Sequence, residues 1–234
     1  LITKIEKDCT DGVDMDSSCI EPDKRCTLVS NHRDIVLDSA FLSKKLLENR
    51  FPCTVEIAIG DNLLVYPWIR RLVRVNKSFI VQRSLQMREF LASSARMSRY
   101  MHFAVNQKHE NIWIAQREGR AKDSHIVPLC ISYEYDPCDY LKASEFQLKR
   151  DNPDYVKTRE NDLLNMRTGI YGYKGRVHYY CAPCIDEWLS KLDASMKKNE
   201  VFEATARHID SEIFKNYRLY PVNYVAADML ENSS

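Results

Sequence analysis

The histidine at position 32 stands beside two carboxylates in a pattern suited to proton transfer. His32 directly follows the apolar segment 26–30 and Asn31, and Asp34 and Asp38 come two and six positions later. An imidazole is a suitable general base because its unperturbed pKa of about 6.5 lies near neutral pH. A carboxylate on the other ring nitrogen would fix the tautomer and stabilise the imidazolium. Asp38 is the preferred partner because Asp34 would more naturally cap the following helix. The alternative is a histidine in a surface turn.

Basic residues follow two other predicted strands and could hold an anion. Arg83 ends the apolar segment 78–82, and the polar loop after 111–115 contains Glu118-Gly119-Arg120 and Lys122. A guanidinium fork can bond two phosphate oxygens at once, so Arg83 is predicted to bind an anionic group. Glu118 would orient Arg83, accept from a substrate hydroxyl, or form a structural ion pair. The alternative for the basic residues is that they are solvated charges.

The segment 66–74 alternates aromatic, aliphatic and basic residues. Trp68 is followed by Arg70, Arg71 and Arg74. Aromatic anchors with neighbouring cations are typical of a segment at an anionic membrane surface. An amphipathic helix packed on the sheet is the alternative interpretation.

The cysteines do not form a recognisable metal motif. The chain has eight, and Cys181 and Cys184 make a Cys-x-x-Cys pair. That pair could be half a zinc site or a redox pair, but no second Cys or His pair follows at zinc-finger spacing. We therefore predict no metal and no cofactor.

Apolar runs alternate with helical patterns, which predicts an α/β fold. We expect a single domain over 1–234, with a central, mostly parallel sheet flanked by helices. Ligands bind outside the carboxyl ends of the strands in such sheets, so the loops beginning at Asn31, Gly60, Arg83 and Gln116 should converge on the active site. Strands are predicted at 26–30, 54–59, 78–82, 111–115, 126–133 and 176–180, and helices at 34–48, 84–107, 140–150, 185–197 and 201–217.

The connection between 111–115 and 126–133 is short for a parallel crossover, which usually needs a dozen or more residues. Either the two strands are antiparallel neighbours, or the chain omits a segment near Ser124; we favour the omission. The residues at 137–234 give a less definite pattern.

The composition is that of an ordinary globular protein. The chain has 234 residues, a formal net charge of +1 and 44% hydrophobic residues. Nothing predicts nucleic-acid binding, and no apolar run approaches the ~20 residues of a membrane span. The segment 1–12 has no apolar core, so we expect no signal peptide. We therefore expect reduced thiols and a cytoplasmic protein, peripheral on the inner face of the membrane.

Four segments within 26–136, in order, resemble the sequence blocks of the glycerolipid acyltransferases. That family comprises the glycerol-3-phosphate and 1-acylglycerol-3-phosphate acyltransferases. The segments are an Asn-His pair before a helix bearing an Asp (30–38), an apolar strand ending in Arg (60–83), a Glu-Gly pair followed by Arg (118–120), and a Pro inside a hydrophobic strand (127–133). The family has four residues between its His and Asp, whereas His32 and Asp38 have five. Its third block normally has a further residue, Thr or Gly, between the Glu-Gly pair and the Arg. Here Arg120 directly follows Gly119.

The resemblance implies transfer of a fatty acyl group from acyl-CoA or acyl carrier protein to a hydroxyl in lipid biosynthesis. The acceptor would be glycerol 3-phosphate, its 1-acyl derivative, or an acylated amino-acid lipid. His32 would act as general base with Asp38 or Asp34. Two other functions are compatible with the same residues: a thioesterase-type hydrolase, and a non-catalytic module that binds membranes or partners.

Overall fold

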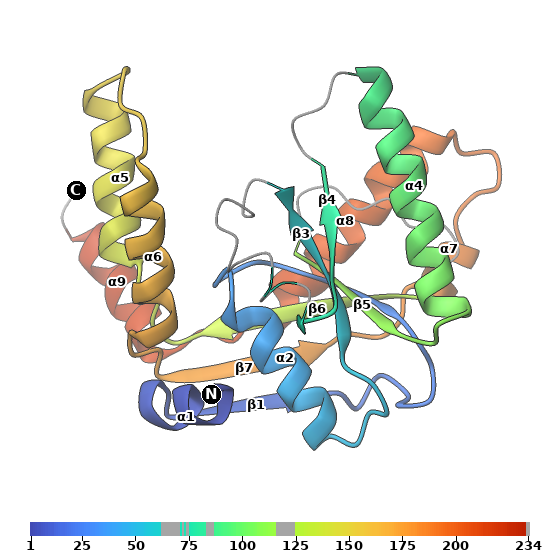
Figure 1. Ribbon diagram of the computed structural model, residues 1–234, viewed down its shortest axis with the longest axis horizontal. Coiled ribbons are helices and arrows are strands. Elements are labelled where there is room, and N and C mark those ends of the chain that lie inside the picture. The colour runs from blue at the N-terminus through green and yellow to red at the C-terminus, as the bar shows by residue number, and fades with distance from the viewer. Residues whose placement is uncertain (62–70, 72, 74, 83–86, 116–124, 233–234) are drawn as a thin grey trace.

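The computed structural model describes residues 1–61, 71, 73, 75–82, 87–115 and 125–232 (Figure 1). Its centre is a seven-stranded sheet in the order β1-β7-β6-β2-β5-β3-β4. The strands are β1 (Gly12–Asp16), β2 (Thr27–Ser30), β3 (Val55–Gly60), β4 (Ser78–Val81), β5 (Asn111–Ala115), β6 (Ile126–Tyr133) and β7 (Arg176–Cys181).

The sheet is mostly parallel, as predicted. Strands β6, β2, β5, β3 and β4 run in one direction, and only the β6–β7 pairing is antiparallel. Strand β1 runs with β7 at the sheet edge. The carboxyl ends of the five codirectional strands therefore lie along the same end of the sheet. The loops that begin at Asn31 and Gly60 start there. The loops that begin at Arg83 and Gln116 start outside the described residues.

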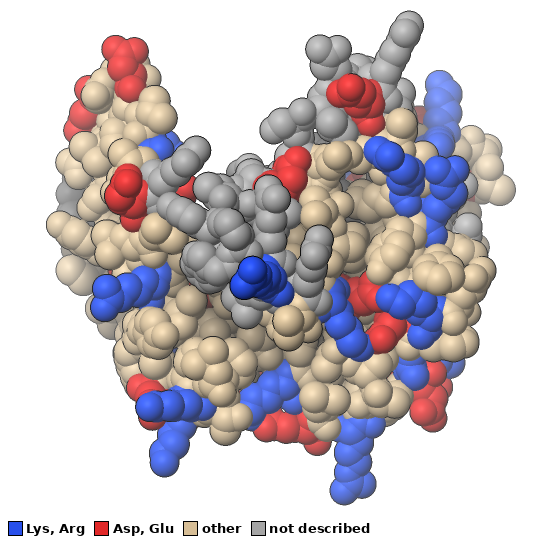
Figure 2. All heavy atoms as spheres, in the orientation of Figure 1, with Lys and Arg blue, Asp and Glu red and all other residues tan. Residues whose placement is uncertain are grey.

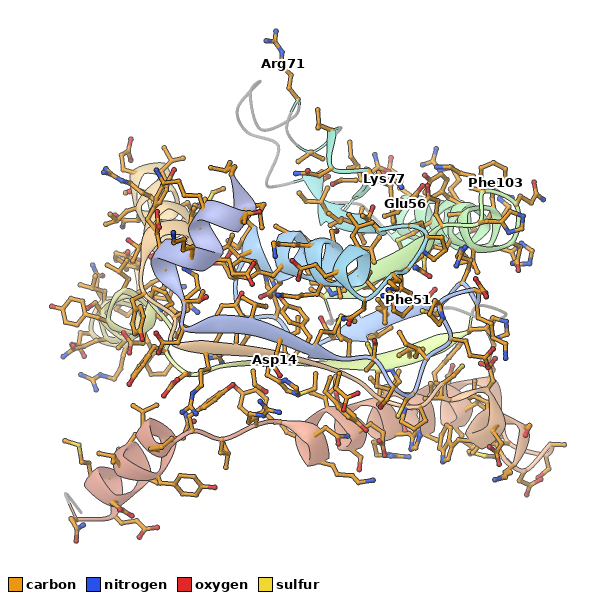
Figure 3. All side chains as sticks on the ribbon, turned by 90° about the horizontal axis from the view of Figure 1, so that it is seen from below. Asp14, Phe51, Glu56, Arg71, Lys77 and Phe103 are labelled. Atoms are coloured by element: carbon orange, nitrogen blue, oxygen red, sulfur yellow. The ribbon has the colours of Figure 1, made fainter. Side chains whose placement is uncertain are left out.

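Helices cover both faces of the sheet, which confirms the predicted α/β class. They are α1 (Ile2–Cys9), α2 (Leu37–Glu48), α4 (Met87–Asn106), α5 (Asp139–Asp151), α6 (Arg159–Tyr171), α7 (Asp186–Ser190), α8 (Lys198–Asn216) and α9 (Pro221–Glu231). In Figure 3 the sheet is seen edge on, with α1 and α2 on one side and α8 on the other. None of the helices in the described part of the chain has the length and apolar character needed to span a membrane.

Alternating strand residues divide the core between the two faces. Leu28 and Trp113 are register partners and pack with Phe41 and Leu42 of α2. Their neighbour Val29 points the other way and packs with Ile209 and other residues near α8. Because β2 is buried on both faces, its residues form the continuous apolar run that the sequence shows.

The connection between β5 and β6 is not a turn between antiparallel neighbours. Both strands pair in parallel with β2, which lies between them. The antiparallel alternative is therefore wrong: β2 is hydrogen-bonded along both of its edges, so β5 and β6 are parallel to each other but are not neighbours. The linking residues 116–124 lie outside the described part, so the proposed omission remains a prediction.

Several elements have no counterpart in the predicted set. Helix α1 and strand β1 begin the chain, α6 lies between the segments predicted as a helix at 140–150 and a strand at 176–180, and α9 follows α8. The helix expected at 185–197 is shorter and ends at Ser190. Figure 1 shows α5 and α6 side by side, standing out beyond the sheet.

Candidate active site at the carboxyl end of β2

His32 and Asp38 form a hydrogen-bonded pair at the end of β2. The ring Nδ1 of His32 lies 2.9 Å from Asp38 Oδ2. The Asp38 side chain is fully buried, whereas the His32 side chain is 41% exposed. An ionised carboxylate only accepts hydrogen bonds, so Nδ1 carries the proton and Nε2 keeps its lone pair. The pair therefore combines a fixed tautomer with a basic nitrogen on a partly exposed ring.

The fold holds the Asp38 carboxylate against the turn that carries His32. Asp38 Oδ2 also accepts from the backbone N–H groups of Arg33 at 2.8 Å and Asp34 at 3.0 Å. The backbone carbonyl of Asp38 accepts from the Tyr179 hydroxyl of β7 at 2.9 Å. These contacts fix both ends of the residue, so the carboxylate is oriented before any substrate binds.

A buried tyrosine lies close to the Asp38 carboxylate. Asp38 Oδ1 and the Tyr133 hydroxyl are both buried and neither makes a hydrogen bond of standard geometry. Burial, followed by the nearby Tyr179 and the Asp38 carboxylate, raises the pKa of Tyr133 well above its ordinary value. Tyr133 therefore stays protonated beside the carboxylate.

Asp34 contacts the backbone rather than the histidine. Its Oδ1 accepts from the N–H groups of Val36 at 2.8 Å and Leu37 at 2.7 Å, where α2 begins. Burial raises the pKa of Asp34, although these two backbone hydrogen bonds oppose the increase. A Cβ added at Gly169 of α6 would overlap Asp34 Oδ2. Asp34 is thus a half-buried cap that α6 approaches closely, and of the two carboxylates it is Asp38 that touches the ring.

Two further residues position His32 and were not among the predicted site residues. Asn31 joins β2 to β6 by donating from Nδ2 to the Ile131 carbonyl and accepting at Oδ1 from the Ile131 N–H, both at 2.8 Å. The ring of Trp113 lies 6.3 Å from that of His32, centroid to centroid, at 57°. The Trp113 Nε1–H donates to Ser30 Oγ at 3.0 Å. The only sequence signal for Trp113 is its place in the apolar segment 111–115. Its position near His32 follows from the pairing of β5 with β2.

Arg33 is the cation next to His32 in the described part of the chain. Its guanidinium lies 3.9 Å from Asp136 Oδ2, which is outside hydrogen-bonding range, and its Nε is buried with no hydrogen-bond partner. A cation held in this way retains bonding capacity for an anion.

Most of the predicted anion-binding and membrane residues lie outside the described residues. These are Arg83, Glu118, Gly119, Arg120, Lys122, Trp68, Arg70 and Arg74. Arg71 is described: it is exposed, and Figure 3 shows it pointing away from the rest of the protein. The roles predicted for all of them stay predictions.

The chemistry available at the described site is base catalysis without an enzyme nucleophile. The nearby Ser30 hydroxyl donates to the Asn31 carbonyl at 2.6 Å and accepts from Trp113. The single O–H donor of Ser30 is therefore not directed at His32. Among the described residues, His125, Cys184 and Asp186 could hold a metal ion, but they lie at another edge of the sheet.

The comparisons with known proteins give likeness to solved structures only. No family model matches the chain, and no curated protein matches it. Among solved structures, the chain is similar to the 1-acyl-sn-glycerophosphate acyltransferase PlsC from Thermotoga maritima. The identity is 12% and the TM-score 0.45, over 92% of this chain and 78% of that one. A likeness of that extent does not establish a common activity, so function has to be argued from the chain's own residues.

Proposed function

We propose that the protein is an O-acyltransferase that moves a fatty acyl group from a thioester to a hydroxyl of a lipid precursor. The observation that carries the proposal is the His32–Asp38 pair: an imidazole at the carboxyl end of β2, oriented by a buried carboxylate. Parallel sheets bind their ligands at this edge. The type of reaction is inferred from the resemblance of the segments within 26–136 to glycerolipid acyltransferases.

The proposed reaction needs one base that later becomes an acid. His32 Nε2 takes the proton of the acceptor hydroxyl while the oxygen attacks the thioester carbonyl carbon. The tetrahedral intermediate then collapses by breaking the carbon–sulfur bond, and the departing thiolate takes the proton from His32. Asp38 stabilises the imidazolium between the two steps. No acyl-enzyme is formed, so no serine or cysteine nucleophile is required.

The proposed donor is acyl-CoA or acyl carrier protein, and the proposed acceptor is glycerol 3-phosphate, its 1-acyl derivative or an acylated amino-acid lipid. Arg83 and the segment 118–122 would bind an acceptor phosphate, with Arg33 as a further cation beside His32. Because such acceptors or their products carry long acyl chains, we propose that the protein works in the cytoplasm, peripherally on the inner membrane face.

The proposal is tested by transfer assays on the purified chain. Labelled acyl-CoA and acyl carrier protein are each offered with the three acceptors, and labelled product lipid and free fatty acid are quantified separately. We expect product lipid with one acceptor and its loss by at least about a hundredfold in His32→Ala, since general bases contribute about 10²–10⁴-fold. The matched control is His102→Ala, because His102 is an exposed histidine of α4.

Other results would redirect the assignment. Free fatty acid released without an acceptor, and lost in His32→Ala, would identify a thioesterase. Full transfer activity in His32→Ala would remove His32 from the reaction. Unchanged acyl thioester in every mixture, with a folded protein, would favour the non-catalytic binding module.

A further inference from the structure

Two segments far apart in the sequence meet where β6 begins and β7 ends. His125 directly precedes β6, and Cys184 and Asp186 follow β7. The antiparallel pairing of β6 with β7 brings these ends together. The Ala182 N–H donates to the Pro128 carbonyl and the Ile185 N–H to the Ile126 carbonyl, both at 2.9 Å. The backbone on each side of the cluster is therefore fixed.

The three side chains place one imidazole, one thiol and one carboxylate at a common point. One nitrogen of His125, Cys184 Sγ and one oxygen of Asp186 lie within 4.8 Å of one another. His125 Nδ1 and Asp186 Oδ2 are in direct contact. Their side chains are 56% and 46% exposed, so both have room to rotate. Ligand atoms of a tetrahedral zinc ion lie roughly 3.3–3.6 Å apart, given bonds of about 2.0–2.3 Å. Small rotations would open the His125–Asp186 contact to that spacing.

We propose that His125, Cys184 and Asp186 form a zinc-binding site, with a water completing the tetrahedron. The site is separate from the proposed active site. Strands β2 and β6 run parallel, His32 follows the carboxyl end of β2, and His125 precedes the amino end of β6. The proposed zinc therefore lies at the opposite ends of the strands from His32.

The donor set selects the metal class. A thiolate with an imidazole and a carboxylate suits zinc, whereas magnesium and calcium take oxygen ligands. The Cys-x-x-Cys pair is not the site, because Cys181 is fully buried in the core that includes Val177 and Tyr179. Cys184 would bind zinc together with His125, which directly precedes β6 and is distant in the sequence. Spacing along the sequence therefore does not reveal these three ligands.

A metal-binding experiment on the full chain tests the proposal without an activity readout. The protein is stripped with a chelator under reducing conditions and titrated with zinc against a chromophoric competitor. A second sample is titrated with cobalt, because a thiolate ligand gives cobalt a charge-transfer band in the near ultraviolet. We expect one zinc per chain, a thiolate–cobalt band, and a higher thermal midpoint with zinc, since a ligand of the native state stabilises it.

Variants decide which residues are ligands. Cys184→Ser should abolish the thiolate–cobalt band, and His125→Asn and Asp186→Asn should each weaken zinc binding at least tenfold. The matched controls are Cys19→Ser and His109→Asn, which replace an exposed cysteine and an exposed histidine outside the cluster. Circular dichroism of each stripped variant checks that it folds.

The proposal is overturned if the folded wild-type chain binds much less than one zinc, or if the cobalt band persists in Cys184→Ser. It is also overturned if the controls weaken binding as much as the cluster variants. If Cys184→Ser does not fold, the wild-type stoichiometry with His125→Asn and Asp186→Asn decides the question. Because His32 takes no part, failure of the acyl-transfer assay leaves this result unaffected.

Discussion

At the scale of single residues, the site separates two carboxylates by what they contact. Asp38 bonds the His32 ring and two backbone N–H groups, and Asp34 bonds the two N–H groups at the start of α2. A carboxylate on the ring nitrogen affects the proton, whereas a carboxylate on backbone donors affects the local fold. Substitutions at the two positions should therefore change different measurements.

We predict that Asp38→Asn lowers turnover far more than it lowers stability. An Asn amide can donate to Nδ1 and favour the wrong imidazole tautomer, an effect worth about 10⁴-fold in the hydrolase triad. We expect a loss of at least about a hundredfold in the transfer rate, measured together with the thermal midpoint. A variant with a normal rate would show that the His32–Asp38 contact has no catalytic role.

We predict that Asp34→Ala costs about 0.5–2 kcal/mol of unfolding free energy, the range for a lost helix cap. Asp34→Asn should cost less, because Asn keeps an acceptor for the Val36 and Leu37 N–H groups. The folded-state pKa of Asp34 is raised, so the fold favours the protonated carboxyl. The stability that comes from this preference is fully present at acidic pH and is lost as pH rises through the folded pKa. Denaturant unfolding of both variants at several pH values measures this.

The stability of Asp34→Asn relative to wild type should therefore improve as the pH rises from acidic to neutral. The opposite trend would mean that the Asp34 carboxylate is stabilised in its ionised form by the fold. Equal losses in the two variants would show that the acceptor oxygen is unimportant.

We predict that Arg83→Lys raises the KM for a phosphate-bearing acceptor more than the KM for the acyl donor. Lys keeps the charge but loses the two-pronged geometry of the guanidinium. Steady-state kinetics with each substrate varied in turn make the comparison, and Arg207→Lys is the control because Arg207 is an exposed residue of α8 outside the proposed sites. An unchanged acceptor KM would mean that Arg83 is structural or that the acceptor lacks a phosphate.

At the scale of secondary structure, α6 helps to shape the site although it contributes no catalytic group. Gly169 lets the helix approach Asp34 so closely that a Cβ would overlap the carboxylate. Near Asp34, Lys174 is fully buried and donates to the Ile170 and Gly172 carbonyls at 3.2 and 2.6 Å. Burial lowers the pKa of Lys174, and the Asp34 carboxylate opposes that change. Helix α6 and the turn before α2 thus approach each other closely at Gly169 and Asp34.

We predict that Gly169→Ala destabilises the protein, against the usual trend. Gly in a helix interior is about 1 kcal/mol less favourable than Ala, so a helix with free space would gain stability. Here the added methyl must displace Asp34, so we expect a lower free energy of unfolding in denaturant titrations. The control is Arg167→Ala, at an exposed position of the same helix. A more stable Gly169→Ala would show that the close approach is absent.

At the scale of the whole molecule, charge is balanced and membrane attraction would have to be local. Figure 2 shows basic and acidic side chains interspersed over the visible face. The formal net charge is +1. Long-range attraction to an anionic bilayer is therefore weak, and binding would depend on a cluster such as Arg70, Arg71 and Arg74.

We predict reversible, salt-sensitive binding to anionic vesicles that weakens about a hundredfold at low salt when Arg70, Arg71 and Arg74 are all changed to Gln. The estimate takes about 1 kcal/mol per cation near the surface and about 1.4 kcal/mol per factor of ten. Trp68→Ala should weaken binding further in a way that salt does not mask, because that contribution is hydrophobic. Co-sedimentation with anionic and neutral vesicles at two salt concentrations provides the measurement.

The matched control replaces three exposed cations elsewhere, Lys191, Lys198 and Arg207, with Gln. If both triple variants lose binding equally, the attraction depends on net charge and not on the segment 66–74. Equal sedimentation of wild type and the first triple variant would show that this segment does not bind the bilayer.

Local sequence patterns were sufficient to place six of the seven strands of the central sheet and to favour Asp38 over Asp34 as the partner of His32. Strands β5 and β6 coincide with the predicted segments because burial on both faces makes each a continuous apolar run with polar ends. The pairing was predictable because only five residues lie between His32 and Asp38, across a strand end and a first helical turn. Contacts of this kind depend on local backbone geometry, which neighbouring residues specify.

Other elements and contacts depend on the tertiary structure, because their partners are distant in the chain. Helix α6 shows almost no segregation of apolar residues to one side, so its pattern does not predict a helix, and it packs through Gly169 on Asp34. Trp113 reaches His32 only because β5 pairs with β2, and His125 reaches Asp186 only because β6 turns back against β7. Such contacts depend on strand order and direction, which hydrogen bonds between distant segments establish and a local pattern does not encode.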